Sequence, residues 1–131
     1  MKKFTSVQQK TGELGEAIAC RFLKRRSFEI IERNYTQKWG EIDIVARRDG
    51  ITRFIEVKSV SCENFEPMSP NADRYRPEDQ AHVRKLKRIS RTIQTYLAND
   101  EVGEWKFDLI CVYINHARKV ARVKMLVDLV L

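Results

Sequence analysis

Residues 40–59, which read GEIDIVARRDGITRFIEVKS, constrain the fold more than any other segment of the chain. Apolar and polar residues alternate on both sides of the pair Asp49-Gly50. An Asp-Gly pair between two alternating runs is among the strongest local signals for a two-residue hairpin turn, because both central residues of that turn need a positive φ. The segment therefore predicts two antiparallel strands, residues 41–47 and 51–59, that are joined at this turn.

The turn also fixes which residues of the two strands face each other. A two-residue loop places Asp43 directly opposite Glu56, and it places Glu41 opposite Lys58. Because strand side chains alternate between the two faces of a sheet, these four polar residues are expected on one face. The other face is expected to carry the apolar residues Ile42, Ile44, Ile55 and Val57.

The facing carboxylates of Asp43 and Glu56 need a compensating cation, because like charges directly across a ladder destabilise a sheet. A bound metal would supply it, since two carboxylates and a main-chain carbonyl form an oxygen cage that suits Mg²⁺. Lys58, on the same face, could then reach a scissile phosphate or the attacking water. A surface hairpin in which Glu41 pairs with Lys58 explains part of the same pattern without any metal. The geometry of the hairpin leaves both interpretations open.

The rest of the chain predicts one domain, residues 11–131, after a polar lead, residues 1–10. A helix is expected over residues 11–26, because apolar residues recur there at helical spacing. A second helix is expected to open at Pro77, after an irregular segment at residues 60–76 that is typical of a long loop. The remaining strands are expected at residues 28–34, 105–115 and 121–131, which gives an α/β fold in the order α-β-β-β-α-β-β.

Charge and composition narrow the class of partner and the compartment. The formal net charge of +7 favours a polyanionic partner, most simply nucleic acid. The three cysteines, Cys20, Cys62 and Cys111, form no Cys-x-x-Cys pair, which argues against a disulfide framework or a zinc site and suits a reducing compartment. The first residues lack the apolar run of a secretory signal, and no stretch approaches the ~18 apolar residues of a membrane span. A cytoplasmic protein with no membrane partner is expected.

Four segments in this order resemble the YraN-like family of small bacterial proteins: TGELGEAIACRFLKRRSFEIIERNY, GEIDIVARRDG, FIEVKS and RKLKRISRTIQTYL. That family is similar to Holliday-junction resolvases and has the PD-(D/E)xK nuclease fold, so the resemblance implies a restriction-endonuclease-like core, a mixed sheet flanked by helices. It implies that Asp43, Glu56 and the carbonyl of Val57 hold Mg²⁺ or Mn²⁺. It further implies that Lys58 is the catalytic lysine, and that Glu16 is a first-helix acid that helps to hold the metal or its water.

The second predicted helix carries a basic face. Arg84, Lys87, Arg88 and Arg91 are expected to project away from its apolar stripe, with Lys85 at the edge of that stripe. The resemblance implies that Lys85 touches phosphate. Cationic contacts supply most of the sequence-independent affinity for DNA, so this face predicts a phosphate-binding ridge. A solvated helix face would carry the same charges, and this alternative also stays open.

Together these features predict a Mg²⁺-dependent endonuclease that acts on DNA, with branched DNA as one candidate substrate. Junction resolvases work as dimers because two strands must be cut, so the resemblance also makes a homodimer a candidate state. One alternative is a nucleic-acid-binding module whose acidic pocket is vestigial and which binds DNA without a metal. Another is an interaction protein that grips an acidic protein partner with the basic helix.

Overall fold

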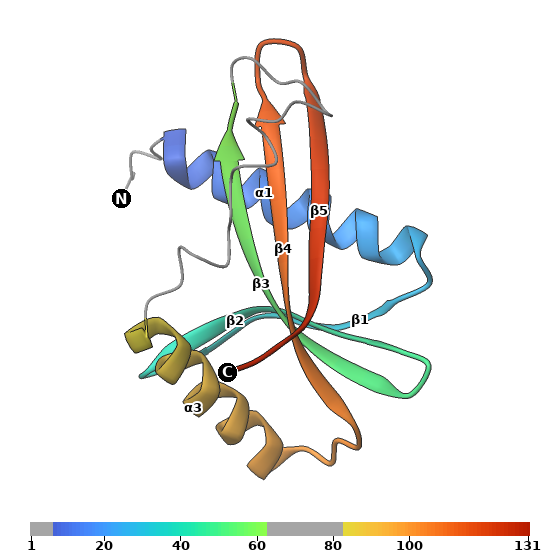
Figure 1. Cartoon of the computed structure of the whole chain (residues 1–131), viewed down its shortest axis with the longest axis vertical. Helices are drawn as coiled ribbons and strands as arrows, with labels where there is room; N and C mark the ends of the chain where they lie inside the picture. The colour runs from blue at the N-terminus through green and yellow to red at the C-terminus, as the bar shows by residue number, and fades with distance from the viewer. Residues whose placement is uncertain (1–6, 63–82) are drawn as a thin grey trace, which may run out of the picture.

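The computed structural model of the chain describes residues 7–62 and 83–131. Within these ranges lie two helices and five strands, in the order that the sequence predicts, so the mixed α/β class is confirmed (Figure 1). The elements are α1 (Val7–Arg25), β1 (Glu29–Gln37), β2 (Gly40–Arg48), β3 (Ile51–Ser61), α3 (Val83–Asn99), β4 (Trp105–Asn115) and β5 (Val120–Leu129).

The five strands form one sheet in the order β1-β2-β3-β4-β5. Neighbouring strands pair antiparallel except β3 and β4, which are parallel. Parallel strands need a crossover connection, and the chain between β3 and β4 contains α3. The sheet is strongly twisted, so that the β1–β2 hairpin runs across the direction of β4 and β5 (Figure 1).

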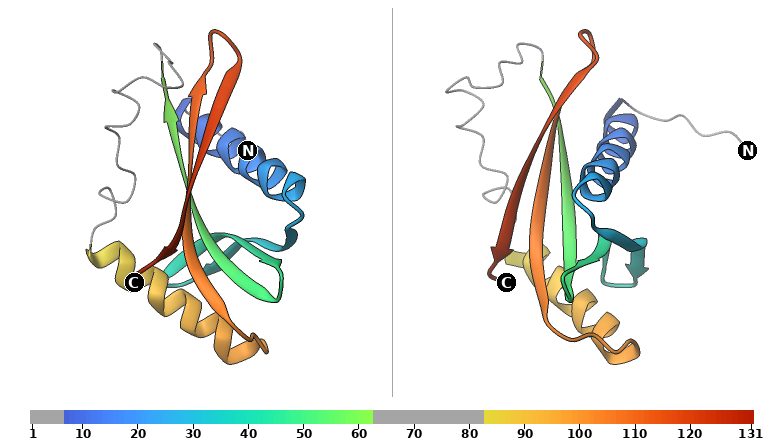
Figure 2. Two further views of the ribbon diagram at one scale, coloured as in Figure 1. Left: turned by 45° about the vertical axis from the view of Figure 1, so that its right-hand side comes forward. Right: turned by 90° about the vertical axis from the view of Figure 1, so that its right-hand side faces the viewer.

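The two helices cover opposite faces of this sheet. Leu23 of α1 packs in one core with Ile55, whereas Ile93 of α3 packs in another core with the adjacent strand residue Phe54. Figure 2 shows α1 on one side of the strands β3, β4 and β5. β4 contributes to both cores, and its residues 107–115 are all buried. No helix in the described ranges is both long and apolar enough to cross a membrane.

The predicted hairpin turn between β2 and β3 is confirmed. Asp49 and Gly50 have φ angles of 54° and 77°, as a type I′ turn requires, and Arg48 pairs with Ile51 beside them. From the turn, the paired register runs as far as Ile44 and Ile55. β2 continues beyond that point in register with β1 alone, so the ladder between β2 and β3 opens there.

One face assignment in this hairpin is wrong. Strict alternation predicts Ile42 on the same face as Ile44, but Ile42 packs in the α3 core together with Val45. Ile44 packs in the α1 core, as does its partner Ile55. The direction of the side chains therefore changes between Ile42 and Ile44, and the strong twist of β2 where it leaves β3 accounts for the change.

β1 is longer than the sequence predicts. It reaches Gln37, which pairs with Gly40 across a two-residue turn, so residues 35–37 lengthen the strand expected at residues 28–34. β1 is an edge strand with mostly polar and charged residues, and apolar alternation could not reveal where it ends. A Cβ on Gly40 would lie 2.8 Å from Thr92 Oγ1, so glycine is needed for the turn to approach α3 this closely.

Further bounds differ from the prediction. α1 begins at Val7, so part of the expected polar lead is helical. β3 continues to Ser61 and so takes in the start of the segment expected as a loop. The rest of that segment and Pro77 lie outside the described residues. β4 has the predicted bounds, and β5 ends at Leu129 instead of at residue 131.

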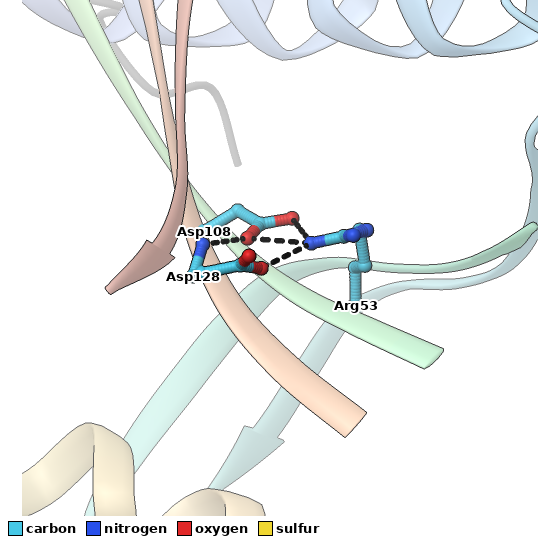
Figure 3. Close-up of polar contacts among 3 residues, drawn as sticks. All are labelled: Arg53, Asp108 and Asp128. Atoms are coloured by element: carbon cyan, nitrogen blue, oxygen red, sulfur yellow. Dashed lines mark hydrogen bonds and ion pairs between the residues drawn. The ribbon is translucent and has the colours of Figure 1, made fainter. Parts of the chain in front are cut away.

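Asp108 is a buried charge that the sequence does not single out. Its side chain is fully buried, and Arg53 Nη1 lies 3.1 Å from each of its two carboxylate oxygens. Arg53 also donates to Asp128 Oδ1 at 3.0 Å, and the backbone N–H of Asp128 donates to Asp108 Oδ1 at 2.9 Å (Figure 3). Burial raises the pKa of Asp108, while the N–H of Asp128 and the guanidinium of Arg53 oppose the shift. The cluster joins β3, β4 and β5 at one point.

Replacing Arg53 should destabilise the protein strongly, because Asp108 would stay buried without its cation. Removing one partner of a buried ion pair costs about 3–5 kcal/mol. We expect Arg53→Met to lower the free energy of unfolding in urea by about this amount. The double variant Arg53→Met, Asp108→Asn should recover much of the loss, since it removes the uncompensated charge as well. Equal losses in the two variants would assign the effect to packing and not to charge.

Candidate metal centre and nucleic-acid interface

Asp43 lies where the β2–β3 ladder opens. The last paired residues are Ile44 and Ile55, and beyond them the backbone N–H of Val57 donates to Asp43 Oδ2 at 2.8 Å. A side-chain carboxylate of β2 thus takes the place of a strand carbonyl as the acceptor. This hydrogen bond holds Asp43 beside Glu56, the residue that precedes Val57 in β3.

Two more carboxylates reach the same place from α1 and β2. Oxygens of Glu16, Glu41 and Asp43 all lie within 4.8 Å of one another. Burial, and then the negative charge of Glu56, raise the pKa of Asp43 to about 8, while the hydrogen bond from Val57 opposes the shift. Burial also raises the pKa of Glu16. The protein on its own therefore holds Asp43 mainly as the neutral acid near pH 7, and a cation in the cluster would favour the carboxylate.

Side chains of β1 contact two of these acids. The amide of Asn34, with its nitrogen turned to the acids, donates to Glu16 and to Glu41 at 3.2 Å each. Arg33 lies 3.8 Å from Glu16, and Thr36 Oγ1 donates to Glu41 at 3.5 Å. β1 thereby orients the side chains of Glu16 and Glu41. The sequence predicted none of these contacts, because it did not show which strand pairs with residues 28–34.

The expected cross-strand pair between Glu41 and Lys58 is wrong. The ladder opens before it reaches these residues, and Glu41 is directed to β1 instead. Lys58 is half-buried on β3, two residues after Glu56, and lies beside Cys111 in the parallel ladder with β4. A Glu41–Lys58 pair on a surface hairpin therefore does not account for the acids.

The acids border a pocket between the β2–β3 hairpin and α3. The pocket has a volume of about 390 Å³, and α3 supplies Lys85 and Arg88 to its wall. Lys85 forms an ion pair with Glu56. The other described lining residues are Gly40, Glu41, Asp43, Glu56 and Ile89. Carboxylates on one wall thus face cations on the other, an arrangement that can hold a divalent cation together with a phosphate group.

The exposed cations of α3 adjoin this pocket. Lys87, Arg88 and Arg91 are exposed, and we call these three residues the basic ridge. Arg88 belongs both to the ridge and to the wall of the pocket. Arg91 stacks over the ring of Trp39 at 4.2 Å from its centroid, which fixes one end of the ridge against the β1–β2 turn. The side chain of Arg84 lies outside the described residues.

The chain has relatives in bacteria. Residues 15–112 match the family described as "Uncharacterised protein family UPF0102". The chain belongs to the UPF0102 family. A UPF0102 protein of Campylobacter jejuni strain 81-176 is 43% identical to it over 102 residues, which cover 77% of this chain and 81% of the relative. A UPF0102 protein of Helicobacter pylori strain HPAG1 is 38% identical over 104 residues, which cover 77% of this chain and 78% of the relative.

The UPF0102 match confirms the predicted family, because UPF0102 is the YraN family. The matched segment extends from α1 into β4 and contains Glu16, Asp43, Glu56 and Lys85. The candidate site therefore lies within the part of the chain that defines UPF0102. The description of the family names no activity.

The donor atoms of the UPF0102 site fit a hard divalent cation. Glu16, Glu41, Asp43 and Glu56 all offer carboxylate oxygens, which Mg²⁺ and Mn²⁺ prefer. The cluster within 4.8 Å contains no histidine or cysteine among the described residues, and these are the ligands that zinc sites favour. The N–H of Val57 binds Asp43. The role of the Val57 carbonyl as a metal ligand stays a prediction.

The raised pKa of Asp43 predicts how stability depends on pH without metal. An aspartate ordinarily titrates near pH 4, so between about pH 4 and about pH 8 the unfolded chain has lost a proton that the folded protein retains. Stability therefore falls as the pH rises through this window. Asp43→Asn cannot ionise and keeps an oxygen for the Val57 N–H. In EDTA it should be more stable than wild type, by a margin that grows from about pH 5 to about pH 8 in urea unfolding.

Divalent metal should reverse this order. A ligand at 100 times its Kd stabilises the native state by about 2.7 kcal/mol, so wild type should melt higher in saturating Mg²⁺ or Mn²⁺. Asp43→Asn and Glu56→Gln should respond little. Asp49→Asn, the same chemical change at the exposed acid of the hairpin turn, should follow wild type throughout. Equal metal-induced shifts in wild type and Asp43→Asn would place the ion elsewhere.

Proposed function

We propose that this UPF0102 protein is a Mg²⁺-dependent endonuclease that acts on DNA. The observation that carries the proposal is the pocket in which Asp43 and Glu56 face Lys85 and Arg88. Hydrolysis of a phosphodiester needs oxygen ligands for a metal and cations for the phosphates, and this pocket offers both. The resemblance of the chain to proteins similar to Holliday-junction resolvases supports the same reaction class.

In the proposed reaction, Asp43, Glu56 and the carbonyl of Val57 hold the metal, and Glu16 helps to hold it or its water. Bound there, Mg²⁺ supplies a polarised phosphoryl oxygen and a water of lowered pKa. Lys58 follows the ligand segment in β3 and orients the attacking water or neutralises charge that develops on the phosphate. Each of these residues except Glu16 comes from the β2–β3 hairpin, so one rigid unit would position the reacting groups.

The cations of α3 would place the substrate. Arg88 reaches the pocket, while Lys87 and Arg91 extend the positive surface along the helix. Such side chains contact phosphates, which fix the position of a duplex but carry no sequence information. We therefore propose a substrate that is chosen by its shape, with branched DNA as the first candidate. A homodimer would present two pockets to two strands.

The ion pair between Lys85 and Glu56 favours one alternative. In that alternative, Lys85 neutralises Glu56 permanently, the pocket takes no metal, and the protein is a nucleic-acid-binding module. The two functions differ in their dependence on metal, because the module binds DNA equally well in Mg²⁺ and in EDTA and leaves it intact.

A cleavage assay on linear, flapped and four-way DNA tests the proposal. Product should form with Mg²⁺ or Mn²⁺ and not with EDTA. Lys58→Ala should retain the metal-induced rise in melting temperature, because lysine is not a metal ligand. Its cleavage rate should fall by at least about 10²-fold, because the substitution removes stabilisation of the transition state. The segment Glu104–Lys106 has the same Glu-x-Lys spacing as Glu56–Lys58, so Lys106→Ala is the matched control and should cut like wild type. Wild-type protein that leaves all three DNAs intact would favour the binding module, and Lys58→Ala that cuts at the wild-type rate would contradict the role of this lysine.

DNA binding should weaken steeply with salt if the basic ridge contacts phosphates. Each lost phosphate contact lowers the slope of log K against log salt by ~0.9 for duplex DNA. Alanine at Lys87, Arg88 and Arg91 together should flatten the slope accordingly in fluorescence anisotropy. A control with alanine at the exposed cations Lys10, Lys24 and Lys124 removes the same charge and should leave the slope close to that of wild type. Equal slopes in the two triple variants would assign the ridge to solvent.

A further inference from the structure

A groove runs between α1 and the β4–β5 hairpin, on the face of the sheet opposite α3. Its volume is about 470 Å³. It arises because α1 packs over β3 and β4, so the side of β5 that faces α1 is left partly uncovered. At the hairpin turn, His116 Nε2 lies 3.2 Å from Thr11 Oγ1, and this contact ties the turn to α1. None of the groups assigned to the metal centre lines this groove.

The wall of the groove is apolar. Leu14, Ile18 and Phe22 lie one helical turn apart along α1, and they face Val120 and Val123 of β5. Ile18, Phe22 and Val123 are half-buried against the α1 core. Leu14 and Val120 are 40% and 43% exposed, so large apolar side chains on both sides of the groove remain open to solvent. An exposed apolar surface of this kind marks a contact site more often than a single exposed residue does.

The rim of the groove is cationic. Arg21, Arg25, Arg26 and Lys119 border it, and none of its described lining residues is acidic. The guanidinium of Arg26 lies over the ring of Phe22 at 3.8 Å from the centroid. The groove therefore complements a ligand that combines apolar side chains with negative charge.

Other occupants match these features less well. A single-stranded nucleic acid would satisfy the rim, but its bases need open aromatic faces to stack on, and Arg26 covers the ring of Phe22. A duplex makes its contacts through phosphates, so it would leave the apolar wall of the groove without a partner. A second copy of this chain carries a net charge of +7 and would be repelled by the rim. Residues 1–6 of the chain include Lys2 and Lys3 and no acid, so they lack the complementary charge.

We propose that the groove docks an acidic peptide segment of a partner protein. Apolar side chains of the peptide insert between α1 and β5, and its carboxylates pair with Arg21 and Arg25 at the rim. The apolar wall supplies the shape that the peptide must fit, and the rim charges accelerate association and make it dependent on salt. This docking site does not rest on the proposed nuclease activity, because it uses other residues on another face of the sheet.

The test is fluorescence anisotropy with a labelled short peptide in which glutamate alternates with leucine and phenylalanine. Wild type should bind it, with an affinity that falls as salt rises. The double variant Arg21→Glu, Arg25→Glu should bind at least about tenfold more weakly. Lys24→Glu is the matched control, because Lys24 is an exposed cation of the same helix that does not line the groove. Its affinity for the peptide should change by no more than about twofold for each unit of charge changed.

Further arms decide between occupants. A peptide with serine in place of leucine and phenylalanine, and the variant Leu14→Ser with the original peptide, should each bind several-fold more weakly. The proposal is overturned if wild type binds none of the alternating peptide, or if the serine peptide binds equally well. It is also overturned if single-stranded DNA displaces the peptide and the affinity for this DNA depends more strongly on Arg21 and Arg25 than the affinity for the peptide does. A dimer in sedimentation that Arg21→Glu, Arg25→Glu dissociates would make a second copy the occupant.

Discussion

The hydrogen bond from the Val57 N–H to the Asp43 carboxylate replaces a strand-to-strand bond at the point where β2 turns away from β3. Because the carboxylate must stay within reach of that N–H, Asp43 cannot turn outward, and it remains in the field of Glu56. The two helices then approach this point from opposite faces of the sheet, α1 with Glu16 and α3 with Lys85. The pocket exists because one strand pair ends early and a side chain completes its hydrogen bonding.

The sequence was sufficient for the part of this site that depends on local geometry. Asp49 and Gly50 both need a positive φ, so the turn type and the register beside it follow from two adjacent residues. The register brings Asp43 to the neighbourhood of Glu56 without any knowledge of the rest of the fold. The partner of Glu41 could not be predicted in the same way, because it depends on a twist that ends the ladder and on an edge strand, β1, whose polar residues show no alternation.

The buried cluster around Asp108 shows a second limit of local patterns. The apolar run of β4 predicts a buried strand, and the strand has the predicted bounds. An acid within such a run must find a cation, but Arg53 is 55 residues away in the sequence and Asp128 is 20 residues away. The parallel pairing of β3 with β4 brings these residues together, and pairing across a crossover leaves no signature in the spacing of either strand.

The ion pair between Lys85 and Glu56 makes the two walls of the pocket thermodynamically dependent on each other. On the proposed function, a DNA phosphate that draws Lys85 away leaves Glu56 uncompensated, which strengthens the attraction of the pocket for a divalent ion. Linkage is reciprocal, so the ion must raise the affinity of the protein for DNA by the same factor. Such a protein would bind its metal weakly at rest and tightly on its substrate, and Lys85 would compete with the ion and so delay assembly of the hydrolytic centre until DNA arrives.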